Sequence, residues 1–339
     1  MNKMVLGKTN LEISKTGYGA LPIQRVNKEV AKKILRKAYE YGITFFDTAR
    51  AYSDSEEKLG YALSDVRKEI VIATKTHAKN PEELLEHIDI SLQNLRTEYI
   101  DIYQLHNMKF VPKPDSEDGL YNVMLKLKEA GTIRHIGLTT HSVEVAEQAI
   151  DSGLYDTIQF PLSLISSERD LALINRAKKA NVGVIAMKAL AGGLIDNAKA
   201  AFAFMRQFDN VVPIWGIQKD WELNEFLVYE ATPPLMDKEI RGIIKKYQDE
   251  LSKDFCRGCG YCMPCPVGIP INTAARMSLL LRRAVYQNFL TEEWQDNMKK
   301  INDCIHCNQC IEKCPYGLNT PELLKKNLLD YEEFLKNNS

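Results

Sequence analysis

Cysteine is absent from the first 255 residues of this 339-residue sequence, and all eight cysteines lie between Cys256 and Cys314. A disulfide-stapled secreted protein would not confine its cysteines to one short segment and leave a large domain bare, so the distribution argues against that class. The N-terminal segment also lacks an apolar stretch long enough for a signal peptide. We therefore expect a cytoplasmic protein in which reduced thiols serve as ligands.

Two classes of partner have little support in the composition. The formal net charge of −1 offers no electrostatic case for binding nucleic acid or an anionic membrane surface. Long apolar runs are also lacking: residues 182–194, for example, are interrupted by Lys188, whereas a membrane helix needs ~20 apolar residues. We expect no nucleic-acid partner and no membrane span.

What the sequence does contain is a regular alternation of short apolar runs and amphipathic segments between residues 13 and 215. The runs are apolar throughout, as parallel strands buried on both faces require. Alternating β and α elements predict a parallel sheet, and eight repeats without a central break predict a closed (β/α)₈ barrel. No GxGxxG follows the first run, which disfavours a doubly wound sheet. The predicted strands are residues 14–20, 44–47, 70–74, 100–105, 136–139, 157–160, 182–187 and 211–215.

Helix-start signals lie between these strands. Asn80 lies three residues before Glu83, a spacing typical of a capped helix N-terminus. Ser53 and Glu56 have the spacing of a capping box. We predict that residues 1–14 form a β-hairpin closing the floor of the barrel.

The residues that end the predicted strands are the candidates for an active site, because barrel enzymes place theirs at the C-terminal ends of strands. The second strand ends at Asp47, with Tyr52 one short loop later, the third is followed by Lys75, and the fourth by His106. A single ionisable residue at a strand end is usually a solvated loop residue. Four together on successive strands predict a catalytic site.

These four residues and their spacing resemble the Asp, Tyr, Lys and His tetrad of the aldo/keto reductase family. The resemblance covers roughly the first 230 residues, including the stretch 47–60. It implies that Tyr52 gives a proton to a substrate carbonyl while a nicotinamide delivers hydride. A neighbouring Lys75 lowers the pKa of Tyr52, and Asp47 holds Lys75 charged and oriented. His106 donates a hydrogen bond to the carbonyl oxygen.

The other histidines have no comparable neighbours in the sequence. We expect structural or surface roles for all of them in the barrel segment, and a spacer role for the one inside the cysteine-rich segment. His141 differs from the rest because it follows a predicted strand. These residues are His77, His87, His135, His141 and His306.

The resemblance also implies a nicotinamide dinucleotide site on the later strands. Thr139 and Thr140 take the place of the family's Ser-Asn pair, and Gln159 that of its Gln, so these three are expected to hold the carboxamide. The aromatic residue that stacks on the nicotinamide is replaced by Met187. Glu222, where the family often has Arg or Gln, disfavours NADPH, and the choice between NADP(H) and NAD(H) stays open. The other expected contacts are Lys188, Leu190, Gly192, Gly216, Lys219 and Glu225.

The eight cysteines form two runs of four. The second run, residues 304–314, has the C-x2-C-x2-C-x3-C-P spacing of bacterial ferredoxins, and the first, residues 256–265, is one residue shorter before its last cysteine. A structural zinc site typically takes two separated pairs, so zinc is the weaker alternative. The expected ligands of two [4Fe–4S] clusters are Cys256, Cys259, Cys262, Cys265, Cys304, Cys307, Cys310 and Cys314.

In two-cluster ferredoxins the cysteine before proline binds the other cluster. By that analogy Cys314 joins the first three cysteines of the first run, and Cys265 joins the first three of the second. The whole chain resembles aldo/keto reductases that carry a C-terminal dicluster segment. We predict a barrel over residues 1–235, a linker helix over 236–253, and a largely helical cluster module with a helical C-terminal tail over 254–339.

Together these features predict an oxidoreductase that transfers hydride between NAD(P)H and a small-molecule carbonyl or alcohol. The clusters would serve structure, or electron transfer from a ferredoxin-type partner. Nicotinamide exchanges two electrons and a cluster one, so direct coupling usually needs a flavin or a radical-competent substrate. Two alternatives therefore stay open: a cluster-driven, ferredoxin-linked reductase whose barrel holds a flavin or reducible substrate, and a redox-sensing subunit with little turnover. The intact tetrad argues against the second alternative.

Overall fold

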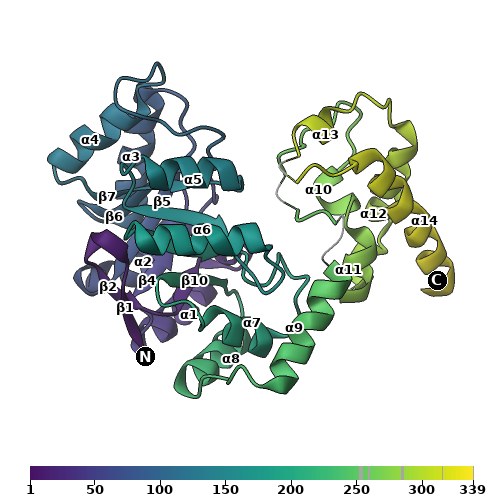
Figure 1. Ribbon diagram of the computed structural model, residues 1–339, viewed down its shortest axis with the longest axis horizontal. Helices are drawn as coiled ribbons and strands as arrows, with labels where there is room; N and C mark the ends of the chain where they lie inside the picture. The colour runs from purple at the N-terminus through teal and green to yellow at the C-terminus, as the bar shows by residue number, and fades with distance from the viewer. Residues whose placement is uncertain (252–254, 259, 284–285, 315, 339) are drawn as a thin grey trace. The chain divides into compact units, whose positions relative to one another are not determined.

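The chain divides into two compact units, which are described separately. The first unit comprises residues 1–189 and 202–235, and the second comprises residues 190–201 and 236–339. Figure 1 draws both units as a ribbon and labels the helices and several of the strands. The computed structural model describes residues 1–251, 255–258, 260–283, 286–314 and 316–338. Cys259, one of the expected cluster ligands, lies outside the described residues.

A β-hairpin opens the first unit. Its inward side chains Met4 and Ile13 belong to the buried apolar cluster of the barrel interior. Gly7, with a φ of +53°, lies against the start of a barrel strand, where an added Cβ would be 2.3 Å from the backbone nitrogen of Gly183. The predicted hairpin at the barrel floor is therefore confirmed. Its two antiparallel strands are β1 (Lys3–Val5) and β2 (Glu12–Ser14).

Eight parallel strands close into a barrel in the order β10-β3-β4-β5-β6-β7-β8-β9, which confirms the predicted (β/α)₈ fold. Most strand residues are buried, because side chains fill the interior and helices cover the outside. The strands are β3 (Gly17–Gly19), β4 (Phe45–Asp47), β5 (Val71–Thr76), β6 (Ile100–Leu105), β7 (Ile133–Thr139), β8 (Thr157–Pro161), β9 (Gly183–Met187) and β10 (Val211–Gly216).

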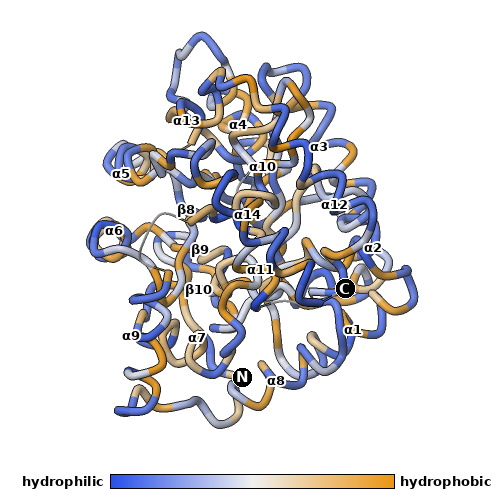
Figure 2. The backbone as a smooth tube through the Cα atoms, turned by 90° about the vertical axis from the view of Figure 1, so that its right-hand side faces the viewer, coloured by the Kyte–Doolittle hydropathy of each residue, from blue (hydrophilic) through white to orange (hydrophobic). Residues whose placement is uncertain are grey.

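The helices between the strands are amphipathic. In α3 the Asn80 side chain accepts from the Glu83 backbone nitrogen at 2.9 Å, as predicted, and Leu84 and Ile88 are buried. Figure 2 shows hydrophilic and hydrophobic residues alternating around α5. The helices are α1 (Lys28–Glu40), α2 (Ser55–Leu63), α3 (Pro81–Leu95), α4 (Leu120–Glu129), α5 (Val143–Asp151), α6 (Glu168–Lys179), α7 (Ala198–Met205) and α8 (Asp220–Ala231).

Two barrel strands begin three residues away from their predicted starts, whereas the bounds of the other six agree with the predictions to within two residues. The run 14–20 is not one strand: Ser14 ends β2, its hydroxyl donates to the Thr16 carbonyl at 2.7 Å across the bend, and only residues 17–19 join the barrel. Strand β7 begins earlier than predicted, because Ile133 pairs with Ile100 of β6.

The capping box predicted at Ser53 and Glu56 is wrong. Ser53 has a φ of +35° and lies two residues before α2 begins. Glu56 is fully buried instead, and the hydroxyls of Thr74 and Ser91 each donate to its Oε1 at 2.7 Å. Arg50 lies 3.3 Å from its other oxygen. A buried carboxylate needs such partners, so Glu56 joins α2 to the barrel wall rather than capping a helix.

Helices dominate the described part of the second unit. The Tyr247 hydroxyl of α9 donates to Asp196, which ties segment 190–201 to this unit. Asn327 of α14 accepts from the Ser278 backbone nitrogen at 2.8 Å and donates to the Ala275 carbonyl at 3.2 Å. The helices are α9 (Lys238–Leu251), α10 (Ile271–Ala274), α11 (Met277–Arg283), α12 (Glu292–Lys299), α13 (Gln309–Glu312) and α14 (Thr320–Asn338).

Short 3₁₀ segments complete the secondary structure. They cover Gly7–Thr9, Pro22–Arg25, Ser64–Glu69, Tyr286–Phe289 and Lys300–Asp303. Within the ranges that the structure describes, no helix has both the length and the apolar character needed to cross a bilayer.

Candidate active site and cysteine module

A buried ion pair occupies the mouth of the barrel. Asp47 ends β4 and Lys75 lies near the end of β5, so two neighbouring parallel strands bring them together. Lys75 Nζ is 2.7 Å from Asp47 Oδ1, and the two side chains are only 1% and 2% exposed. Lys75 also donates to the Thr48 carbonyl. A buried pair of this kind persists only with close geometry and further hydrogen bonds, and both are present here.

Two glutamines complete the surroundings of Asp47. The amide nitrogens of Gln104 on β6 and Gln159 on β8 each lie 3.5 Å from a carboxylate oxygen of Asp47, and Gln104 donates to Gln159 at 2.9 Å. Burial raises the pKa of Asp47, and the charge of Lys75 is the largest influence in the opposite direction. Gln104 was not predicted from the sequence. The available signal was a polar residue inside an otherwise apolar strand.

Tyr52 lies over the Lys75 ammonium. Lys75 Nζ is 5.2 Å from the centre of the Tyr52 ring, which meets the His106 ring edge to face at a centroid distance of 5.9 Å. Burial raises the pKa of Tyr52, and the charge and hydrogen bond of Lys75 oppose this without reversing it. The expected effect of Lys75 is thus present, but burial outweighs it. Tyr52 keeps its proton at neutral pH, as a proton donor requires.

Two half-buried histidines lie at the same end of the barrel. Burial, with the charges of Lys75 and His77, lowers the pKa of His106 to about 3. His106 is therefore neutral at physiological pH, with one ring nitrogen as donor and one as acceptor. His141, which we expected to be structural, has its Nδ1 3.1 Å from Asn107 Oδ1, and burial lowers its pKa to about 3 as well.

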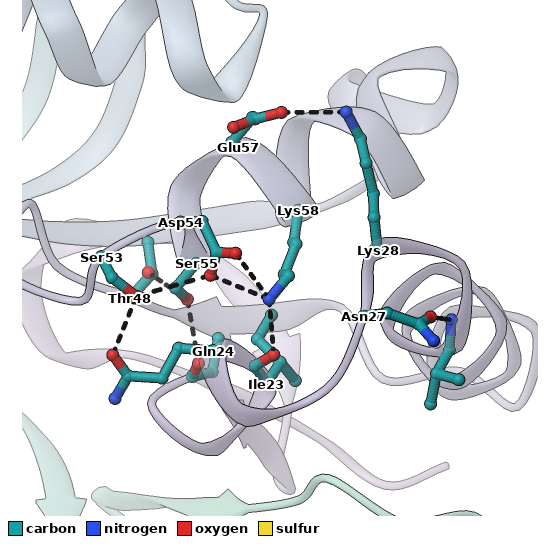
Figure 3. Close-up of polar contacts among 12 residues, drawn as sticks. Ile23, Gln24, Asn27, Lys28, Thr48, Ser53, Asp54, Ser55, Glu57 and Lys58 are labelled. Atoms are coloured by element: carbon teal, nitrogen blue, oxygen red, sulfur yellow. Dashed lines mark hydrogen bonds and ion pairs between the residues drawn. The ribbon is translucent and has the colours of Figure 1, made fainter.

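A second polar network fixes the loop that carries Tyr52 (Figure 3). The Ser55 hydroxyl donates to a main-chain carbonyl just after β3 at 2.9 Å. Lys58, with a side chain only 5% exposed, pairs with Asp54 at 2.8 Å and donates to the Ile23 carbonyl at 3.0 Å. These bonds connect the β4–α2 loop and the start of α2 to the segment after β3, so the loop that carries Tyr52 is held in place.

Thr139 and Thr140 were predicted to contact the carboxamide, but their hydroxyls form hydrogen bonds to the backbone of the loop after β6. Thr139 Oγ1 accepts from the Asn107 backbone nitrogen at 2.7 Å, and Thr140 Oγ1 donates to the Met108 carbonyl at 2.8 Å. Both threonines are buried. The structure therefore brings Gln159 to the tetrad, whereas Thr139 and Thr140 hold the loop that follows His106.

The N-terminus of α8 is capped by an acidic side chain. Glu222 Oε2 accepts from the backbone nitrogens of Gln218 at 2.8 Å and Lys219 at 2.9 Å. This carboxylate occupies the position where a helix N-terminus would otherwise favour a phosphate. Glu225, another predicted cofactor contact, accepts from the Tyr229 hydroxyl at 2.8 Å.

The remaining predicted cofactor contacts follow β9 and β10. Met187 and Lys188 are half-buried at the end of β9, and Met187 packs against the barrel core. Gly216 is exposed at the end of β10. Lys188 and Gly192 have φ values of +58° and +67°, so the chain turns sharply here. Leu190 and Gly192 belong to the second unit.

The described cysteines line two cavities of the second unit. In each cavity, a cysteine that precedes a proline in the sequence lies with cysteines of the other run. The lining cysteines of the first cavity are Cys256, Cys262 and Cys314. Those of the second are Cys262, Cys265, Cys304, Cys307 and Cys310.

A guanidinium lies beside the first cavity. Arg276 Nη1 is 3.5 Å from the Gly192 carbonyl, and its buried Nε has no hydrogen-bond partner among the described residues. At Gly258, where φ is +65°, an added Cβ would lie 2.9 Å from this guanidinium, so a side chain there would require the guanidinium to shift. Burial lowers the pKa of Arg276, and Cys256 acts in the opposite direction. A cation with an unpartnered buried donor fits a thiolate-ligated, anionic cluster at this position.

Comparisons with known proteins identify the same two parts. Residues 3–242 match the aldo/keto reductase family, and residues 255–319 match the 4Fe-4S dicluster domain. L-galactose dehydrogenase of Arabidopsis thaliana is 31% identical over 209 residues, which is 56% of this chain and 66% of that protein. The aldo-keto reductase YhdN of Bacillus subtilis is 30% identical over 211 residues, or 56% and 62% of the two chains.

Solved structures show the same likeness of fold. An aldo-keto reductase from Bacillus halodurans in its holo form has a TM-score of 0.64 at 23% identity, covering 73% of this chain and 96% of that one. The chain spans less than two thirds of the length of either curated relative.

Proposed function

This chain belongs to the aldo/keto reductase family, and from that premise we propose that it transfers hydride between a nicotinamide dinucleotide and a small-molecule carbonyl or alcohol. The observation that carries the proposal is the buried Asp47–Lys75 pair with Tyr52 and His106 above it. Ionisable groups that are buried together at a barrel mouth, with shifted pKa values, are typical of a catalytic site.

Each member of the tetrad has a distinct part in this chemistry. Bound NAD(P)H supplies the hydride that adds to the carbonyl carbon. Tyr52 gives its proton to the carbonyl oxygen, and the Lys75 ammonium stabilises the phenolate that this leaves. Asp47 holds that ammonium in place. His106, neutral at physiological pH, donates a ring N–H to the same oxygen and so orients the substrate.

We propose that the dinucleotide is held by residues at the ends of β7 to β10. Gln159 fits the carboxamide best, because its amide already lies at the tetrad. Thr139 and Thr140 shape that end of the site through the loop they hold. The Glu222 carboxylate at the α8 N-terminus repels a 2′-phosphate, which favours NAD(H) over NADP(H). The further proposed contacts from the first unit are Met187, Lys188, Gly216, Lys219 and Glu225.

For the second unit we propose two [4Fe–4S] clusters with exchanged last ligands. Cys314 would complete the cluster of Cys256, Cys259 and Cys262, and Cys265 that of the second run. Bound clusters would supply one-electron transfer, so direct exchange with a nicotinamide would need a flavin or a radical-competent substrate between them. The observation that favours electron transfer over a structural role is the Arg276 guanidinium, which interacts with Cys256 and would stabilise the more negative reduced state of a cluster there. A cluster-linked reductase supplied by a ferredoxin-type donor is therefore the second candidate function.

Tyr52→Phe tests the hydride-transfer proposal directly. General acid catalysis typically contributes ~10²–10⁴-fold, so turnover should fall by about that factor while nicotinamide binding changes little. A panel of small aldehydes and aldoses is the first substrate set, since one relative is named as an L-galactose dehydrogenase. Tyr41→Phe is the matched control, because Tyr41 is 60% exposed and lies between α1 and the start of β4, whereas Asp47 is at the other end of that strand.

Two results would contradict the proposal in different ways. Near-wild-type turnover of Tyr52→Phe with a nicotinamide donor would remove Tyr52 as the proton donor. Reduction supported by a reduced ferredoxin, with no binding of NADH or NADPH, would instead establish the cluster-linked reductase.

A further inference from the structure

Three side chains that can bind a metal lie together beside the barrel mouth, outside the tetrad. They are His77, Glu83 and His87, and one ligand atom from each lies within 4.8 Å of the other two. His77 follows β5, two residues after Lys75, and the other two lie in the first turns of α3. From the sequence, both histidines were expected to have only structural or surface roles.

Hydrogen bonds to the second nitrogen of His87 and the second oxygen of Glu83 orient the atoms of these residues that would bind a metal. The Nδ1 atom of His87 is hydrogen-bonded to Thr76 Oγ1 at 2.8 Å, which turns Nε2 away from the barrel wall. The Lys79 backbone nitrogen donates to Glu83 Oε2 at 2.8 Å, which leaves Oε1 for a ligand. Glu83 Oε1 and His87 Nε2 then lie 3.9 Å apart on one face of α3, four residues from each other. Metal-binding histidines usually have such an oriented second nitrogen.

The ligand set points to a particular class of metal. Two imidazoles and one carboxylate, with a fourth position left to water, is a frequent set for zinc, and imidazole also suits copper, nickel and iron. Ligand atoms around a tetrahedral zinc ion are about 3.3 Å apart, given Zn–N distances of ~2.0–2.1 Å. The atoms here need to approach by about one ångström, and His77 is exposed and can rotate to do so.

We propose that His77, Glu83 and His87 bind one divalent transition-metal ion of the zinc type. The two histidine rings already lie 4.7 Å apart between centroids. An ion at this position would add positive charge next to His106, whose pKa His77 already lowers.

Zinc titration of the anaerobically prepared holoprotein tests the site, because iron then occupies the cysteine thiols. Isothermal titration calorimetry and metal analysis after gel filtration should find one zinc ion per wild-type chain. His87→Gln and Glu83→Gln should each weaken binding by about 100-fold or more, and Thr76→Val by about 10–100-fold. Glu86→Gln, an exposed carboxylate on the same helix, is the matched control and should bind zinc like the wild type.

Thermal unfolding shows whether the variants fold and gives a second readout. Zinc should raise the unfolding temperature of the wild type and of Glu86→Gln, but not that of His87→Gln. If His87→Gln does not fold, Glu83→Gln decides, since glutamine keeps an oxygen for the Lys79 N–H. Absence of zinc uptake by the wild type would overturn the proposal, and so would equal affinity in Glu83→Gln and Glu86→Gln. Neither result depends on the turnover assay that tests Tyr52.

Discussion

Replacing Lys75 with methionine would leave Asp47 buried without its cation. The Asp47 side chain is 2% exposed, and the ammonium of Lys75 lies 2.7 Å from it. Methionine is unbranched and flexible, so it can fill most of the space of the lysine stem. The two glutamine amides at 3.5 Å remain, but they carry no charge. The substitution therefore removes a charge with little loss of packing.

The expected loss of stability in Lys75→Met comes from protonation of the Asp47 carboxylate once its cation is gone. A buried carboxylate without a partner takes up a proton rather than staying charged. Its native pKa is then raised far above the unfolded value of ~3.9, so the native state binds the extra proton and stability falls as the pH rises above that value. Each pH unit costs about 1.4 kcal/mol, which gives about 4 kcal/mol at pH 7 and about 2 kcal/mol at pH 5.5.

Urea unfolding at these two pH values measures the effect. Hydrogen exchange of peptides from β4 and β5 separates the barrel from the second unit. The double variant Lys75→Met/Asp47→Asn has no carboxyl to protonate, so it should recover most of the lost stability and show no such pH dependence. Equal destabilisation by Lys75→Met at both pH values, or no recovery in the double variant, would refute the reasoning. Turnover of Lys75→Met should fall as far as that of Tyr52→Phe.

Three further outcomes are expected. Cys314→Ser should damage the cluster of the first run, seen by electron paramagnetic resonance, and damage confined to the other cluster would reject the ligand exchange. Arg276→Gln should lower the midpoint potential of the cluster near Cys256 by an amount on the order of tens of millivolts, because a cation favours the more negative reduced cluster. An unchanged potential would show that the guanidinium has no electrostatic effect on this cluster. Glu222→Gln should raise the ratio of kcat/KM for NADPH to kcat/KM for NADH about fivefold, because it removes roughly 1 kcal/mol of repulsion. An unchanged ratio in steady-state kinetics would show that the 2′-phosphate binds away from Glu222.

Periodicity and spacing were sufficient to predict the barrel, and they also pointed to both groups of candidate site residues. Buried parallel strands are apolar along their whole length, so the eight runs were visible without any knowledge of pairing. Strand ends meet at one face of a barrel, which is why Asp47, Lys75 and His106 could be placed together from three separate segments. The cysteines needed no tertiary information, since four thiols at short spacing are a local pattern.

Only the tertiary structure decided which polar side chains pair with one another. Glu56 has the spacing of a helix cap, but it is a buried acceptor because Thr74 and Ser91 come to it from two other elements. Gln104 joins the tetrad because its side chain points into the barrel, where Gln159 meets it from a strand 55 residues away.

The tertiary structure also determined how the histidines are grouped, and whether burial or the charge of Lys75 has the larger effect on the pKa of Tyr52. His77 and His87 are ordinary residues in the sequence and become a ligand set only where the end of β5 passes the first turns of α3. Lys75 was correctly expected to lower the pKa of Tyr52, but the depth of burial that outweighs it follows from packing around the loop. The partners of a side chain and the depth of its burial depend on segments distant along the chain. A local sequence pattern therefore predicts neither the partners nor the burial.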